Sequence, residues 1–264
     1  VRQQFTINIK QDCPATPDQQ HKLPFHIPVA VGLLDKQGQP IALQQHGQTE
    51  PNTEETIVLS IIEAEQQFTF INIASGPVLS LLRGFSAPVK VELVRSNAEL
   101  AFLMANDTDS FSRWDAGQQL LINILMQLVE TAKQGSTLTL PIELIEQFAK
   151  VLTDADSEPA LVAKMLLLPS ENYLAAQQKP SDVDAIHTAR SFVKKELAVK
   201  LKQQFSELYS SLNTKAVYVF NADAMAKRSL KNICLDYLMV TGDPMQIQRC
   251  LKQMKQADNM TDTL

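Results

Sequence analysis

The hydrophobic period of this chain changes once, near Ser96, and that change most constrains the fold. Before Ser96 apolar residues alternate with polar ones, and after it they recur at steps of three and four residues. Alternation places successive side chains on opposite faces of a β-strand, whereas the longer period builds the apolar stripe of an amphipathic helix. The sequence therefore predicts β-structure over residues 1–95 and an α-helical array over residues 96–264.

Turn signals divide the first 95 residues into short strands. The predicted strands carry, in order, Phe5, Ile7 and Ile9; Phe25, Ile27, Val29, Val31 and Leu33; Ile57, Leu59 and Ile61; Phe68 and Phe70; and Val89, Val91 and Leu93. Breaks are predicted at 35–38, where Gly38 permits positive φ, at 50–53 and at 75–77. Pro28 has no backbone donor and is expected at an edge or bulge. Short strands with regular turns indicate an immunoglobulin-like antiparallel β-sandwich.

The remaining residues read as amphipathic helices joined by short loops, which favours antiparallel helix pairs. Ser96 and Glu99 have the spacing of a capping box at the first helix start. The next predicted helix carries Trp114, Leu121, Leu125, Leu128 and Ala132 on its apolar stripe. It is followed by a helix from 142 to 152, with Pro141 in its first turn, and by one from 161 to 168 after Pro159. The longest predicted helix runs from Ser181 to about Leu212, and two more are predicted, one between Asn221 and Gly242 and one starting at Asp243-Pro244. No fixed-period repeat is visible.

Composition excludes several classes of protein. The net charge is -5, which argues against a broad nucleic-acid surface. Lys194, Lys195, Lys200 and Lys202 are interpreted as the solvated face of a helix. No apolar run approaches the roughly 20 residues of a membrane span, and no signal peptide is visible. The three cysteines are too few and too widely spaced for a disulfide framework, which suits a reducing compartment and predicts a cytoplasmic location.

No residue in the sequence is assigned a catalytic, cofactor-binding or metal-binding role. The four histidines, His21, His26, His46 and His187, stand alone, and no His-Glu-x-x-His occurs. The acidic pairs Asp182/Asp184 and Asp154/Asp156 are better explained as helix-boundary residues than as an acid/base pair. Trp114 with Phe111 and Arg113 is better explained as core than as a ligand platform, and Cys234 as a small core residue.

Six longer stretches carry a family resemblance, and in order along the chain they are 26–35 (HIPVAVGLLD), 77–89 (PVLSLLRGFSAPV), 109–116 (DSFSRWDA), 167–170 (LLPS), 226–232 (AKRSLKN) and 258–262 (DNMTD). These stretches resemble the bacterial aminopeptidase N family of zinc-dependent gluzincin peptidases. Together they cover nearly the whole chain. The resemblance implies a β-sandwich domain over 1–95 and the first part of the C-terminal helical domain over 96–264, with both chain ends interpreted as cuts in a longer polypeptide.

The same resemblance implies a parent enzyme that removes N-terminal amino acids from peptides, with zinc as its cofactor. The family's His-Glu-x-x-His, its distal glutamate ligand and its Gly-x-Met-Glu-Asn motif have no counterpart here. The expectation is therefore a fragment that is itself inactive and binds no zinc. It would act as scaffold and cap, with the catalytic domain of the same polypeptide as its partner, and with neither nucleic acid nor membrane as a partner.

An alternative is a freestanding module, in which the sandwich and helices bind a protein partner. A reading frame that continues upstream through His-Glu-x-x-His would favour the enzyme, and a start codon just before Val1 would favour the module. In the fragment interpretation, the helical end is expected to expose apolar surface and to associate.

Overall fold

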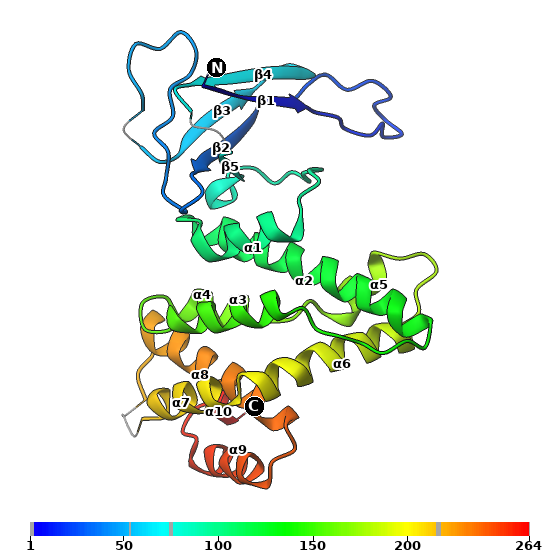
Figure 1. The fold of residues 1–264 in the computed structure, drawn as a ribbon, viewed down its shortest axis with the longest axis vertical. Helices are drawn as coiled ribbons and strands as arrows, with labels where there is room; N and C mark the ends of the chain where they lie inside the picture. Colours follow the sequence, from blue (N-terminus) through cyan, green and yellow to red (C-terminus); the bar gives the residue numbers. More distant parts are fainter. Residues whose placement is uncertain (1–2, 53, 74–75, 215–217, 264) are drawn as a thin grey trace. The chain divides into compact units, whose positions relative to one another are not determined.

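The computed structural model describes residues 3–52, 54–73, 76–214 and 218–263 (Figure 1). The chain forms two compact units, residues 1–116 and residues 117–264, with the boundary inside one helix. The predicted β-then-α architecture is confirmed, since strands occupy the first unit and helices fill the second.

The first unit contains two antiparallel sheets. One pairs β1 (Gln4–Lys10) with β4 (Glu65–Ile71). The other has the order β3-β2-β5, with β3 at Ile57–Ile61, β2 at Ile27–Leu34 and β5 at Val78–Leu81. Strands β1 to β4 correspond to four of the predicted strands and place apolar side chains on the face toward the other sheet. Strand β5 was not predicted from the sequence.

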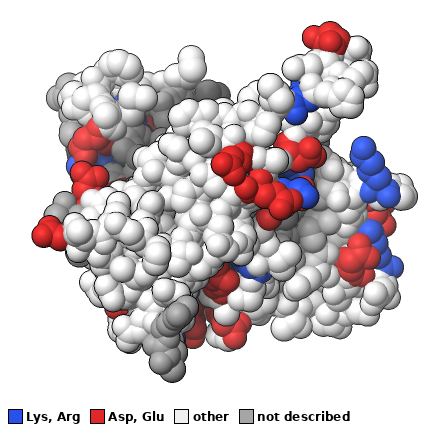
Figure 2. Space-filling model, turned by 90° about the horizontal axis from the view of Figure 1, so that it is seen from above, with Lys and Arg blue, Asp and Glu red and all other residues white. Residues whose placement is uncertain are grey.

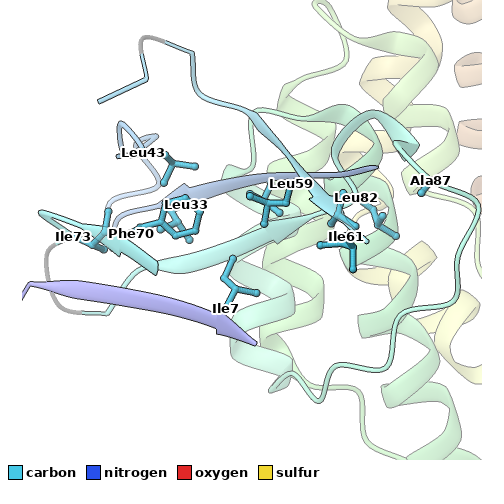
Figure 3. Close-up of a cluster of buried hydrophobic side chains, with 11 residues drawn as sticks. Ile7, Leu33, Leu43, Leu59, Ile61, Phe70, Ile73, Leu82 and Ala87 are labelled. Atoms are coloured by element: carbon cyan, nitrogen blue, oxygen red, sulfur yellow. The ribbon is translucent and has the colours of Figure 1, made fainter. Parts of the chain in front are cut away.

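The outward face of the β1–β4 sheet is a polar ladder and its inward face is core. Lys10 pairs with Glu65 at 3.2 Å, and Thr6 hydrogen-bonds Thr69 across the strands at 3.2 Å. Figure 3 shows the buried apolar cluster of this unit, which draws on β1 to β4 and on residues outside the strands, while Leu79 and Leu81 of β5 pack against it. Its members are Ile7, Val29, Val31, Leu33, Leu43, Leu59, Ile61, Phe70, Ile73, Leu82 and Ala87. One continuous cluster therefore holds the two sheets together.

Strand β2 differs from the prediction in two ways. Phe25 lies outside the strand and is exposed, and both faces of β2 are buried from Val29 onward. The second face is covered because the side chain of Arg83 lies against Gly32, where an added Cβ would come within 2.5 Å of the Arg83 guanidinium. Pro28 pairs with β3 alone, since β5 reaches only as far as Val31. The backbone N–H that Pro28 lacks is therefore not needed for pairing with a second neighbouring strand, as expected.

The predicted strand at 89–93 is wrong. Residues 87–95 form no strand, although Val89 packs against the sandwich core. The turn at 35–38 is confirmed, with Gly38 at φ 81 and its N–H bonded to the Asp35 carbonyl at 3.0 Å. The breaks at 50–53 and 75–77 include Thr53 and Ser75, which lie outside the described residues.

The helices begin where capping residues predict. Helix α1 (Asn97–Asn106) starts after Ser96, whose hydroxyl accepts from Glu99 N at 3.1 Å. The reciprocal half of the capping box is replaced by an ion pair of Glu99 with Arg95 at 2.8 Å. Asn221 caps α8, and Asp243 caps α9 directly before Pro244. Pro141 stands at the N-cap of α3, one position before the predicted first turn.

The second unit is a stack of helices around α8 (Figure 1). Its elements are most of α2 (Ser110–Lys133), α3 (Ile142–Thr153), α4 (Pro159–Met165), α5 (Glu171–Ala176), α6 (Val183–Lys200), α7 (Lys202–Leu212), α8 (Ala222–Val240), α9 (Pro244–Gln256) and α10 (Met260–Thr263). Helix α8 contacts α4, α6, α7, α9 and α10. Tyr237 of α8 is fully buried, stacks on Phe205 at 4.6 Å and donates its hydroxyl to the Leu166 carbonyl at 2.7 Å.

The predicted long helix from Ser181 to Leu212 is two helices. Leu201, at φ -108 and ψ 18, separates α6 from α7. No glycine or proline stands between Asp184 and Leu212, so no local sequence signal marks the break. The apolar stripe continues through it, because Leu197, Leu201 and Phe205 are all buried. Within the described residues, no helix is long and apolar enough to cross a membrane.

Burial predicts that Cys234 is protected from thiol reagents. Cys234 on α8 is fully buried, and that burial raises the pKa of its thiol to about 12. At about pH 8 almost no thiolate is present and no reagent can reach the sulfur. A pulse of iodoacetamide on the native chain, read by peptide mass spectrometry, should modify the half-buried Cys250 of α9 and leave Cys234 unmodified until urea is added. Equal labelling of both cysteines in the native chain would contradict the packing described for α8.

Candidate functional site

The histidines considered from the sequence do not come together. His26 lies one residue before β2 and is exposed. His187 is exposed on α6, and its Nδ1 lies 2.9 Å from Glu171 Oε1. His46 lines an open cleft of about 450 Å³ on the β1–β4 sheet, together with Gln4, Gln45, Gln67, Phe68 and Thr69. Besides His46 and Phe68, the residues that line this cleft carry side-chain amides and one hydroxyl, and none of them carries a carboxylate.

The acidic pairs occupy helix ends, but only one of them fits the dipole argument. Asp182 caps α6 by accepting from Ala185 N at 3.0 Å, and Asp184 lies in the first turn. Asp154 instead follows the C-terminal end of α3, where a carboxylate does not complement the helix dipole. Its carbonyl shapes the turn toward α4 by accepting from Ser157 N at 3.2 Å and from Glu158 N at 2.9 Å.

The aromatic residues around Trp114 form a partly exposed row. The Phe85 and Phe111 rings lie 5.1 Å apart, and those of Phe111 and Trp114 lie 5.8 Å apart, both in tilted arrangements. Arg113 is buried instead, and its Nε donates to the Met104 carbonyl at 3.4 Å. Phe111 and Trp114 are therefore only partly core.

The charged residue at the centre of the first unit is Arg83, in the 3₁₀ turn Arg83–Phe85 that follows β5. Its Nη2 lies 3.2 Å from Asp107 Oδ1, directly after α1, and the two side chains are 5% and 0% exposed. Nη2 also donates to the Thr108 hydroxyl. Nη1 donates to the Glu55 carbonyl at 3.1 Å and to the Thr56 hydroxyl at 2.8 Å. One guanidinium therefore joins the end of β5, the approach to β3 and the link from α1 to α2.

Asp109 makes a second connection beside it. Its Oδ2 accepts from Gly84 N at 3.0 Å, while its Oδ1 accepts from Ser112 N at 2.8 Å in the first turn of α2. Asp109 N in turn donates to Asp107 Oδ1 at 3.0 Å. The stretches 77–89 and 109–116 thus meet in space and form one polar junction, here called the Arg83 junction.

The second unit has a comparable junction at its C-terminal end. Lys231 of α8 pairs with Asp262 of α10 at 2.8 Å, with side chains 7% and 13% exposed. Asn232 Nδ2 donates to the Thr261 carbonyl at 2.6 Å, and its Oδ1 accepts from Gln253 of α9 at 2.9 Å. The stretches 226–232 and 258–262 therefore also meet, and their polar side chains connect three helices.

The lysine cluster predicted as a solvated face is only partly so. Lys194 pairs with Asp236 of α8 at 2.8 Å, and Lys202 pairs with Asp243 at 2.8 Å, whereas Lys195 and Lys200 are exposed. The hydrogen bond from Lys202 lowers the pKa of the Asp243 carboxyl below its ordinary value of 3.8, and the bond from Met245 N adds to this. Asp243 therefore fixes both the start of α9 and its attachment to α7.

The described residues contain no group of three or more His, Cys, Asp or Glu side chains placed to hold a metal ion. The described residues therefore do not supply a zinc centre of three protein ligands. Figure 2 shows one face of the molecule, on which acidic and basic side chains of the described residues are scattered over a mostly uncharged surface.

The fold is an Ig-like sandwich followed by stacked helices, and the family comparisons agree with it. A family described as "Domain of unknown function (DUF3458_C) ARM repeats" matches residues 97–264, and one described as "Domain of unknown function (DUF3458) Ig-like fold" matches residues 1–94. The chain belongs to the DUF3458_C family, whose match covers more than half of its length.

Similar proteins carry the name that the sequence resemblance predicted. Aminopeptidase N of Escherichia coli is 39% identical over 262 residues, covering 99% of this chain and 29% of that protein. Aminopeptidase N of Haemophilus influenzae is 33% identical, covering 98% and 29%. A crystal structure of Legionella pneumophila aminopeptidase A in complex with aspartic acid matches with a TM-score of 0.77 and 25% identity, over 98% of this chain and 29% of that one. The chain thus spans less than a third of the length of these relatives, and the predicted resemblance is confirmed.

The stretches that form both junctions stand out in the sequence, but their pairing was not predicted from it. A signal was present for Arg83, which stands in an otherwise apolar run, but not for Lys231, which follows Lys227, Arg228 and Ser229. A charge in such a run is buried and needs a partner. The partner itself could not be read from the sequence, because Asp107 and Asp262 are each more than 20 residues away.

Breaking the Arg83 pair should be costly. Arg83→Met leaves the buried Asp107 carboxylate without a counter-charge and should lower the free energy of unfolding of the first unit by about 3–5 kcal/mol. Trp114 is the only tryptophan of the chain, so its fluorescence during urea unfolding reports on this unit.

Two further variants control this measurement. Arg83→Met combined with Asp107→Leu should recover most of the loss, because no buried charge remains. Lys10→Met removes the exposed pair with Glu65 and should change the free energy by less than about 1 kcal/mol. An Arg83→Met chain as stable as the Lys10→Met chain would contradict a buried pair.

Acid should weaken the attachment of α9. The pKa of Asp243 is lowered in the folded chain, so its contribution to stability is present above the unfolded value of about 3.8 and is lost as the pH falls through the lowered pKa. Asp243→Asn keeps a good N-cap but loses the charge. Thermal unfolding followed by far-UV circular dichroism should show the two chains differing at about pH 6 and converging at about pH 2. A difference that stays constant over this range would contradict the role of the Asp243 charge.

Proposed function

We propose that this chain is the sandwich and helical part of a zinc aminopeptidase, and that it contributes structure and no catalytic residue. In this proposal residues 1–95 form the sandwich domain and residues 96–264 the first part of the helical domain. The catalytic domain belongs to the same polypeptide and removes N-terminal amino acids from peptides. The observation that carries the proposal is that nearly the whole chain matches under a third of proteins named Aminopeptidase N.

The residues of this chain are consistent with a structural role. The sequence lacks His-Glu-x-x-His and Gly-x-Met-Glu-Asn. Among its charged interior residues, Arg83, Asp107, Lys231 and Asp262 form pairs that connect elements of their own unit. Groups held in this way are poor candidates for acid–base chemistry, which needs a proton-transferring side chain within reach of a substrate. They serve instead to fix loops and helix ends.

Within the parent enzyme the chain would form walls and a cap over the active site. A cap restricts access to small peptides and excludes water from the reacting groups. Zinc is the cofactor that we propose for the catalytic domain, and its ligands lie outside residues 1–264. The free cysteines Cys13, Cys234 and Cys250 favour a reducing compartment, and we place the parent in the bacterial cytoplasm, in peptide catabolism.

The proposal predicts a sharp division of activity. The longer polypeptide that contains this chain should hydrolyse alanyl and leucyl anilides, hold stoichiometric zinc and lose activity when a chelator removes the metal. The 264-residue chain alone should show neither turnover nor stoichiometric zinc, with its helix content checked by circular dichroism. Chelator-resistant turnover by the pure short chain would refute the structural role, and a longer polypeptide without aminopeptidase activity would refute the parent assignment.

A further inference from the structure

The residues between the 3₁₀ turn and α1 leave apolar side chains in solvent. Phe85 is 53% exposed, Val91 46%, Leu93 45% and Val94 100%. We call residues 85–94 the connecting segment. Apolar residues this exposed are ordinary when scattered, but four of them within ten residues mark a surface that another chain segment covers.

The backbone of this segment is also unpaired. Val89 packs against the sandwich core, and Val91 and Leu93 continue its alternation into solvent. Residues 90–94 nevertheless form no backbone-to-backbone hydrogen bond with any residue that the structure describes. The sequence is that of a strand, and what it lacks is a partner. An extended stretch with open donors and acceptors is the usual template for strand addition.

Phe85 is held in place despite an unfavourable backbone. Its φ is 53°, and Leu82 before it has φ 54°, values that side chains other than glycine and asparagine rarely adopt. Such conformations persist when surrounding contacts determine them, and they cluster at functional sites. Here Arg83 is buried and Asp109 binds Gly84 N, so the Arg83 junction fixes the turn that presents the Phe85 ring toward solvent. The Phe111 ring supports it at 5.1 Å.

We propose that the connecting segment is a docking surface for an extended segment of the same polypeptide that lies outside residues 1–264. This rests on the proposed function, in which the chain is part of a longer polypeptide. The relatives hold the matched region in chains of which it is only 29%, so ample chain exists to supply the segment. The segment pairs with the backbone of 90–94 and carries alternate apolar residues that cover Val91, Leu93 and Phe85.

Amide hydrogen exchange on the longer polypeptide tests this. The amides of residues 90–94 should exchange at least about tenfold more slowly than unstructured amides. Leu93→Asp should remove this protection and should also speed exchange in one segment outside residues 1–264. Val58→Asp is the matched control, because Val58 is 59% exposed on β3 of the same unit, and it should change neither.

Three results would overturn the docking surface. These are unprotected amides at 90–94, a Leu93→Asp effect confined to residues 1–264, and protection that depends on protein concentration and so comes from a second copy. Anilide hydrolysis by the same preparation separates this proposal from the proposed function. Hydrolysis with unprotected amides refutes the docking surface alone, whereas protection without hydrolysis supports docking and refutes the enzymatic assignment.

Discussion

The ion pair between Arg83 and Asp107 is the interaction on which the first unit depends. It is almost completely removed from water, and it connects the end of β5 to the end of α1. Desolvation of two charges offsets most of their attraction, so the pair adds little net stability although breaking it is expensive. Arg83 Nε and Asp107 Oδ2 have no hydrogen-bond partner among the described residues, which lowers the net gain further. We infer that the pair specifies geometry, because one guanidinium bonds both residues 55–56 and residues 107–108.

Several residues near Arg83 are explained by the position of its guanidinium. Gly32 lies in the central strand β2, where glycine weakens a strand, yet any side chain there would meet Arg83. Leu82 and Phe85 accept positive φ on either side of the buried residue. Asp109 then caps α2 while binding Gly84 N, so the first turn of α2 is tied to the turn after β5. The second unit repeats this strategy with Lys231 and Asp262, which tie α10 to α8.

Local patterns predicted the elements well where the stabilising interaction was itself local. Ser96, Asn221 and Asp243 cap helices as predicted, since a cap satisfies amides only two or three residues away. The failures occurred where no local signal was available. The break at Leu201 is one of them, because no glycine or proline stands between Asp184 and Leu212. The pairing of the recognised stretches was missed for the same reason, because no local pattern encodes which carboxylate a buried cation meets.

The strand predicted at 89–93 is a failure of another kind. Its alternation is real, since Val89 faces the core and the next two apolar residues follow at the correct spacing. A strand is defined by a hydrogen-bonded neighbour as well as by its own residues, and none of the described residues supplies that neighbour. Local preference and observed structure normally agree in a natural chain, and disagreements concentrate at functional positions. The mismatch at residues 90–94 therefore supports the proposal that this segment pairs with a chain segment outside residues 1–264.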